Sequence, residues 1–138
     1  MKKIALFASA LVFSIAVMAQ TKADDVVKFN TEKHDFGKIK QGVPVTFFFE
    51  IKNIGDKPLV VENASASCGC TVPEKPEKPI NPGATGKIKV QFNAAAVAPF
   101  TKDIFIKFAG VDQPKTVQIT GEVVANTDNS TSKKTGNK

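Results

Sequence analysis

The feature that most constrains this chain is a repeated alternation of apolar and polar residues. At 43–51, and again at 88–92 and 104–108, apolar side chains stand at every second position. Side chains of an extended strand point to opposite faces in turn, so each of these segments buries one face. An amphipathic helix would instead space its apolar residues three and four apart. The chain is therefore predicted to form β-strands that share one core.

Weaker alternation predicts four more strands, at 26–29, 36–39, 59–64 and 117–124. Segments rich in Gly, Pro, Asn and Asp separate the strands, and these residue types favour turns. Seven short strands with no convincing helix predict an all-β, antiparallel β-sandwich. Phe48 and Phe105 break the alternation on what should be outer faces. Either sheet edges or a neighbouring loop cover them, or they belong to a partner surface.

The two ends of the chain differ from this alternating middle. A short basic start followed by an apolar run over 4–17 matches a secretory signal. This apolar run is too short to span a membrane. We expect cleavage after Ala19, which divides the chain into a signal peptide (1–19), a β-sandwich domain (20–125) and a polar tail predicted to be disordered (126–138). The mature protein is expected to be periplasmic or extracellular, with no transmembrane segment.

Charge argues against nucleic acid as a partner. All 19 basic residues are lysines, so the chain has no arginine guanidinium that could bind a phosphate group through two hydrogen bonds. Residues 20–125 contain 14 lysines and 12 acidic residues, which is a net charge of +2. So balanced a segment has no basic stripe that could bind the phosphates of a nucleic acid and release their counterions. The chain also has no Trp or Tyr and a single histidine, His34. We expect an unidentified protein partner, no nucleic acid and no enzymatic activity.

Cys68 and Cys70 are the only cysteines, with Gly69 between them. In an exported protein they are expected to be oxidised, although a bridge across one residue closes a very small ring that adds little stability. Four interpretations stay open: a structural pair, thiol redox exchange, an intermolecular disulfide, or a soft-metal site for copper as Cu(I). His34 is the only further soft ligand for such a metal, and zinc would require two molecules to share it. Because neighbours on a strand face opposite ways, His34 and Asp35 are not expected to act as a catalytic pair.

The order of several short motifs resembles the bacterial domain of unknown function 1573 family, over about residues 26–124. The motifs are Phe36-Gly37, Gly42, Asn53 with Gly55, Pro58-Leu59, Ser67-Cys68-Gly69-Cys70-Thr71, Pro82-Gly83, Ile88 to Phe92, and Gly121. The resemblance implies an exported, immunoglobulin-like sandwich similar to major sperm protein and PapD-like domains, common in Bacteroidetes-like bacteria and without an established reaction. Pro99 departs from the family pattern, which has glycine before Phe100, and puts the local turn in doubt.

The resemblance also implies structural roles for the turn residues. Asn53 and Gly55 shape the turn that follows the strand over 43–51, and Pro82-Gly83 forms a type II-like corner. Gly37 and Gly42 are expected at further turns. The cysteine motif should lie where a strand leaves the sandwich. We therefore predict a noncatalytic exported module that acts through protein contact or as a scaffold in the cell envelope, with a copper or thiol-redox module as the alternative.

Overall fold

Eight strands and one helical turn follow each other along residues 19–126, which are the part of the chain that the computed structural model describes. The elements are α1 (Ala23–Val26), β1 (Val27–Phe29), β2 (Lys33–Lys40), β3 (Val45–Asn53), β4 (Val61–Ala66), β5 (Thr71–Glu74), β6 (Thr85–Phe92), β7 (Pro99–Phe108) and β8 (Lys115–Val124). The predicted signal peptide, apart from Ala19, and the predicted tail, apart from Asn126, lie outside the described residues. Both stay predictions.

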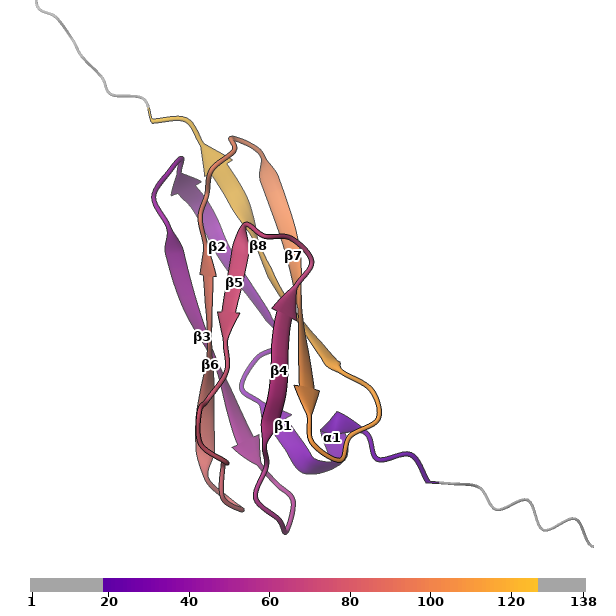
Figure 1. The fold of residues 1–138 in the computed structure, drawn as a ribbon. Helices are drawn as coiled ribbons and strands as arrows, with labels where there is room; N and C mark the ends of the chain where they lie inside the picture. Colours follow the sequence, from indigo (N-terminus) through magenta and orange to yellow (C-terminus); the bar gives the residue numbers. More distant parts are fainter. Residues whose placement is uncertain (1–18, 127–138) are drawn as a thin grey trace, which may run out of the picture.

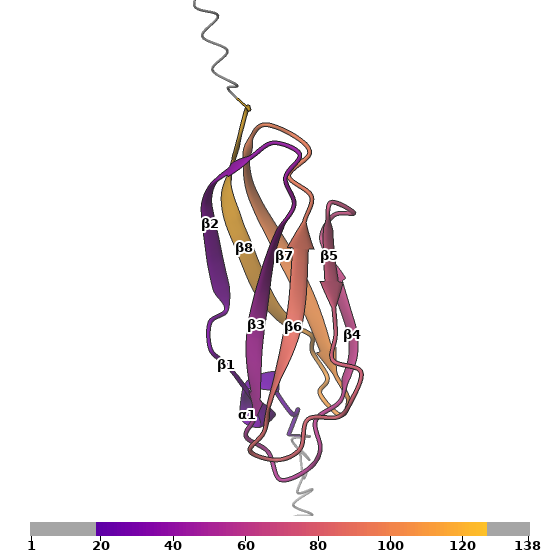
Figure 2. The ribbon, with the colours of Figure 1, turned by 90° about the vertical axis from the view of Figure 1, so that its left-hand side faces the viewer.

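The strands form two four-stranded sheets that pack face to face (Figures 1 and 2). We call them sheet A, with strand order β1-β3-β6-β5, and sheet B, with order β2-β8-β7-β4. β4 and β5 are neighbours at one edge of the sandwich, while β1 and β2 lie at the other edge (Figure 2). The all-β sandwich predicted from the alternation is confirmed.

The register of the central strands shows how the alternation builds the core. Phe49 of β3 is paired with Ile88 of β6, and both side chains are fully buried. Ile104 of β7 is paired with Val117 of β8 and faces them from the other sheet. Burying a side chain of this size stabilises the fold by about 1.5–3 kcal/mol relative to exposure. The core therefore lies between the two central strand pairs.

Three features differ from the sequence prediction. β5 was missed because its four residues include Pro73 and show no clear alternation. The turn of helix α1 was also missed, and four residues give no periodic signal. In addition, β2 runs parallel to β8, although an antiparallel sandwich was predicted. The chain changes sheets at residues 30–32, so β2 lies beside the last strand and not beside its sequence neighbours.

Asn53 ends β3 and ties two turns together from inside the fold. Its side chain is fully buried, and its amide donates to the carbonyls of Lys57 (2.7 Å) and Ile80 (2.8 Å). Its side-chain oxygen accepts from the N–H of Gly55 (2.9 Å), and its backbone carbonyl accepts from Gly83 (2.9 Å). One buried amide thus connects the turn after β3 with the turn before β6.

The corner at Pro82-Gly83 is a type II turn. The N–H of Ala84 donates to the carbonyl of Asn81 (2.9 Å), and Gly83 has a φ of +77°. A type II turn requires a positive φ at its third residue, which glycine adopts without steric cost. Gly42 (φ +72°) lies in the turn between β2 and β3, whereas Gly37 (φ +65°), predicted at a turn, lies inside β2 at the register shift between Asp35 and Lys38.

Pro99 does not form the turn that its family position left in doubt. It is the first residue of β7 and is paired with Glu122. Proline is tolerated at the first residue of a strand, where its missing N–H does little damage to the ladder. The strand can therefore begin at Pro99 without distortion.

Candidate functional site

The cysteine motif lies in the crossing from β4 of sheet B to β5 of sheet A. Cys68 and Cys70 are joined by a disulfide, and both residues are half-buried. The N–H of Thr71 donates to the carbonyl of Cys68 (3.3 Å), and the N–H of Asn93 donates to the carbonyl of Cys70 (3.0 Å). The disulfide is therefore held in a turn at the rim of the sandwich.

Thr71 places one hydroxyl beside both sulfur atoms. Its side-chain oxygen lies 3.8 Å from the Sγ of Cys68 and 3.9 Å from the Sγ of Cys70, and the residue is 3% exposed. Sulfur is a weak acceptor in a thiol or disulfide, but a thiolate accepts charge-assisted hydrogen bonds. The buried hydroxyl is placed to favour a thiolate at either cysteine.

A small hollow opens beside Cys70, between the ends of β6 and β7. It has a volume of about 150 Å³, and its walls include Cys70, Phe92, Ala96, Ala98, Phe100 and Lys102. We call it the alanine hollow, because alanines of the loop between β6 and β7 form much of its wall. The sequence motif gave no sign of it, because the loop and the cysteines are far apart in the chain.

His34 is not brought to the cysteines. Its ring stacks on Phe47 of β3 with a centroid distance of 3.6 Å and meets the ring of Phe36 at 4.6 Å. β2, which carries it, and β4, which leads to Cys68, are the two outer strands of sheet B, about 14 Å apart at the usual strand spacing. Within residues 19–126, no three His, Cys, Asp or Glu side chains lie together as possible metal ligands.

The outer face of sheet A carries an exposed aromatic ring. Phe48 stands on the central strand β3, 48% exposed, opposite Lys89 of β6. Around it lie two ion pairs, Lys87 with Glu50 (3.4 Å) and Lys89 with Glu74 (3.0 Å). Phe105, on the outer face of sheet B, is 37% exposed. Neither ring is fully covered by a sheet edge or a loop, and Phe48 is the more exposed of the two.

Two lysines add charge to the same face of sheet A. Lys28 of β1 and Lys52 of β3 are directly opposite each other, and both are exposed. Among the described residues neither has an ion-pair partner. Like charges opposite each other on neighbouring strands destabilise the pairing. Sequence reasoning missed this pair, because the register between β1 and β3 cannot be read from the alternation.

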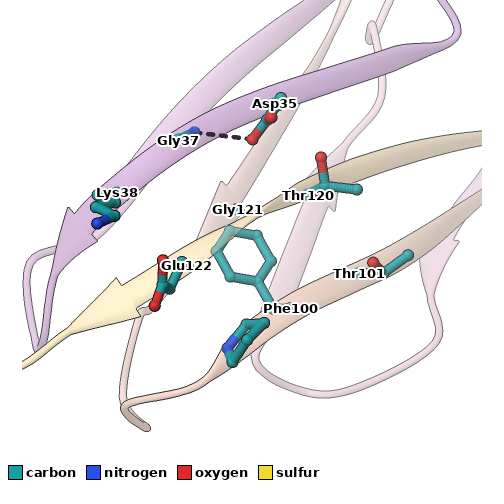
Figure 3. Close-up of a pocket in the computed structure, with 9 residues that line it drawn as sticks. Asp35, Gly37, Lys38, Phe100, Thr101, Thr120, Gly121 and Glu122 are labelled. Atoms are coloured by element: carbon teal, nitrogen blue, oxygen red, sulfur yellow. Dashed lines mark hydrogen bonds between the residues drawn. The ribbon is translucent and has the colours of Figure 1, made fainter.

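A shallow depression on sheet B surrounds Gly121 of β8 (Figure 3). The ring of Phe100 lies against Gly121, and a Cβ atom there would come within 2.8 Å of it. Asp35 accepts a hydrogen bond from the N–H of Gly37 (2.8 Å) at the rim. Gly121 thus allows β8 to pack closely against the ring of Phe100 from β7 and the backbone of β2, which gives this depression a structural role.

Lys115 of β8 links α1 and the segment before β2 to sheet B through two ion pairs. Its Nζ lies 2.7 Å from Oδ1 of Asp24 and 2.7 Å from Oε1 of Glu32, and 6.0 Å from the centroid of the Phe29 ring. Burial lowers the pKa of Lys115, but the hydrogen bonds and charges of the two carboxylates outweigh it and raise the pKa above its ordinary value. The ammonium group therefore stays charged and holds α1 in place.

No helix among residues 19–126 has the length and apolar character needed to cross a bilayer. A family model described as "Protein of unknown function (DUF1573)" matches residues 27–123. This match confirms the resemblance drawn from the cysteine and glycine motifs. No curated protein matches the sequence significantly.

Several solved structures share the fold. A protein of unknown function from Porphyromonas gingivalis W83 is similar with a TM-score of 0.62 and 18% identity over 81% of this chain and 51% of the other. The VesB protease of Vibrio cholerae is similar with a TM-score of 0.58 and 14% identity, over 74% of this chain and 33% of the protease. The PapD-like domain 7 of human CEP192 is similar with a TM-score of 0.56 and 12% identity, over 82% of this chain and 96% of that domain.

These likenesses confirm the immunoglobulin-like, PapD-like sandwich, and at such identities they concern the fold alone. The chain spans about half of the Porphyromonas protein and a third of the protease. One fold hosts many unrelated functions, so no activity is carried over from either protein. The function of this chain depends on its own surfaces.

Proposed function

We propose that this chain, which belongs to the DUF1573 family of proteins of unknown function, is a noncatalytic, exported module of the cell envelope that binds another protein. The contact is made by the outer face of sheet A around Phe48. The observation that carries the proposal is this ring, 48% exposed on a central strand and ringed by charged side chains.

The surroundings of Phe48 have the anatomy of a binding surface. Exposed Val72 of β5 adds apolar area to the same face, while the ion pairs of Glu50 and Glu74 form a charged rim. Protein interfaces place aromatic anchors at the centre and polar groups at the rim, and few residues carry most of the binding energy. Phe48 is placed as such an anchor.

The charge of this face favours an acidic partner. Lys87 and Lys89 are paired with glutamates, whereas Lys28 and Lys52 face each other across β1 and β3. A carboxylate of a partner would relieve the repulsion between these two lysines. Binding is therefore expected to weaken as salt rises, because exposed charges are screened over about 10 Å at 0.1 M ionic strength.

The strand edges favour face packing over edge pairing. β1 has three residues, and β5 has four residues with Pro73 among them. β2 exposes several lysines along its free edge and contains a register shift between Asp35 and Lys38. Short length, proline, lysine and bulges all discourage a strand from pairing with another chain. The broad outer face of sheet A is the better candidate.

The contact is tested with Phe48→Ser and its matched control Phe105→Ser, which removes an exposed ring from the other sheet. The partner is first isolated from envelope extract and identified by mass spectrometry, and its affinity for each variant is then measured with purified proteins. Phe48→Ser should weaken binding about 30-fold, the effect of losing an anchor worth about 2 kcal/mol. Equal affinity of the Phe48→Ser variant and the wild type would overturn the proposal.

The charge argument is tested separately with Lys52→Glu. Its control is Lys33→Glu, which changes an exposed lysine on the outer side of sheet B. The first variant should bind the partner more weakly and lose part of the salt dependence, and the second should not. An unchanged salt dependence for Lys52→Glu would contradict an acidic partner surface.

Export is tested on the protein recovered from the envelope fraction of its host. Its intact mass should correspond to a chain that begins at Gln20, with or without cyclisation of that glutamine. A chain that keeps residues 1–19 in the host would contradict export.

A further inference from the structure

We propose that the Cys68–Cys70 disulfide is a thiol–disulfide exchange site, and that it oxidises a partner dithiol whose cysteine is followed by a bulky apolar residue. That residue occupies the alanine hollow. The site goes beyond the proposed binding face, because it lies at the β4–β5 crossing and the β6–β7 loop and not on the outer face of sheet A.

The disulfide is partly exposed, and its small ring is expected to add little to the stability of the sandwich. Both cysteines are half-buried, in a turn outside the paired strands. A bridge with a sequence separation of 2 closes a very small loop, so its contribution through loop-closure entropy is at the low end for disulfides. Exposed bridges in small rings are reduced more readily than structural ones.

Thr71 supplies the group that the reduced form needs. Its buried hydroxyl lies within 4 Å of both sulfur atoms, and the only hydrogen-bond partners found for it among residues 19–126 are these sulfurs. Whichever sulfur leaves as a thiolate finds a donor already in place. A hydrogen bond to a charged acceptor is about twice as strong as one to a neutral acceptor, so the hydroxyl favours the reduced form.

The alanine hollow supplies recognition. Its volume of about 150 Å³ is similar to that of a protein cavity that holds benzene, so a leucine or phenylalanine side chain fits. Cys70 and Lys102 both line it. The ammonium group of Lys102 attracts an incoming thiolate, while the apolar walls bind the residue next to it. The combination of one positive charge, an apolar socket and a disulfide fits a cysteine followed by a bulky apolar residue.

The reaction transfers two electrons from the partner dithiol to the disulfide. A partner thiolate attacks the Sγ of Cys70, which forms a mixed disulfide and releases Cys68 as a thiolate beside Thr71. The second partner thiolate then attacks the partner's own sulfur and releases Cys70. The two protons lost by the partner thiols end on Cys68 and Cys70, so the partner leaves as a disulfide and the protein as a dithiol.

The first experiment equilibrates full-length protein with mixtures of reduced and oxidised glutathione, followed by thiol alkylation and intact mass. The wild type should pass from oxidised to reduced within the range of these mixtures. Thr71→Val, which keeps the shape of the side chain, should lower the equilibrium constant for reduction about tenfold, because it removes a hydrogen bond to a charged group. A protein that stays fully oxidised in excess reduced glutathione would overturn the exchange site.

The second experiment measures the rate of oxidation of two dithiol peptides that differ in the residue after the attacking cysteine, leucine or aspartate. The leucine peptide should react at least fivefold faster. Ala96→Glu, which places a charge in the hollow, should abolish this preference. Val97→Glu is the matched control, because Val97 is 50% exposed but does not line the hollow. Equal rates for both peptides with the wild type would refute recognition by the hollow.

Folding is monitored independently in every variant. Thermal unfolding followed by circular dichroism should be unchanged for Ala96→Glu and Val97→Glu, because both side chains are exposed. If the Thr71→Val variant unfolds, Thr71→Ser provides the second measurement, because it keeps the hydroxyl and should preserve the wild-type equilibrium. A Thr71→Ser variant shifted about tenfold, or a Thr71→Val variant with the wild-type equilibrium, would remove Thr71 from the mechanism.

Discussion

Asn53 provides the sharpest test of how the turn motifs hold the sandwich. Replacing it with aspartate keeps the shape and the oxygen that accepts from Gly55, but removes the amide that donates to the carbonyls of Lys57 and Ile80. A carbonyl left without a donor costs about 1–3 kcal/mol where it is buried, as at Ile80, and less where it is partly buried, as at Lys57. Asn53→Asp should therefore destabilise the fold by about 2–5 kcal/mol at pH 7. For a domain of this size that is roughly 10–20 °C in the unfolding midpoint.

The pH dependence of this loss follows from the carboxyl group that the substitution introduces. Burial among carbonyl oxygens disfavours its charged form, so its pKa in the folded variant should lie above the unfolded value of about 3.9. Well below a pH of about 3.9 the group is protonated in both states, and in the folded variant it donates to one carbonyl. As pH rises, the unfolded chain loses the proton first, so stability falls by about 1.4 kcal/mol per pH unit until the folded pKa is reached.

Urea denaturation at pH 3.5 and pH 7 measures the free energy of unfolding of the variant relative to wild type. The matched control is Asn93→Asp, where the exposed side chain also accepts from a backbone N–H two residues on, that of Ala95 (3.2 Å). It should stay within about 0.5 kcal/mol of wild type. A variant at position 53 that is as stable as wild type at pH 7 would refute the claim that this amide connects the two turns.

Three further predictions concern packing, charge and the disulfide. Gly121→Ala should lower the free energy of unfolding in urea by about 1–3 kcal/mol, because the added methyl group meets the ring of Phe100 at 2.8 Å. Gly69→Ala is the control and should leave this free energy nearly unchanged, because the space around Gly69 is open. Lys115→Met should cost about 1 kcal/mol, because its carboxylate partners are largely exposed. The folded pKa of Lys115 lies above its ordinary value of 10.5, so its contribution to stability is complete below pH 10.5. The contribution is lost as pH rises through the higher folded pKa, so wild type and variant should converge at high pH. Replacing Cys68 and Cys70 with serine should lower the free energy of unfolding by at most about 2 kcal/mol. Loss of the folded state would contradict the claim that the disulfide adds little to stability.

The alternation predicted those strands that have one face in the core and the other face in solvent. Apolar and polar residues alternate along most of β3, β6 and β7. Because this period is two residues, it determines which side chains face the core. β5 has four residues and a proline, so it carried no periodic signal. Its existence depends on pairing with β6, a tertiary contact. The parallel pairing of β2 with β8 was equally hidden, because pairing partners depend on the path of the chain between sheets.

The candidate site was predictable only where its residues are consecutive. The Cys68-Gly69-Cys70 spacing pointed to a disulfide or redox pair. Whether His34 could join it depended on the strand order, which places β2, the strand of His34, and β4, the strand before Cys68, at opposite edges of sheet B. The alanine hollow combines a loop near residue 96 with a turn near residue 70. Likewise, the pairing of Lys28 with Lys52 on the same face as Phe48 depends on the register between β1 and β3. Contacts between distant segments of the chain are not encoded in any local pattern.

Photo-cross-linking in the native host tests the proposed contact most directly. A photoreactive phenylalanine analogue is placed at position 48, and at position 105 in a parallel strain, with the protein at its natural level in the envelope. Position 48 should give a light-dependent adduct with one protein, and the yield of the adduct should fall when Lys52→Glu is added. An adduct at position 105 alone, or none at position 48 in cells where the protein is present, would contradict a binding face on sheet A.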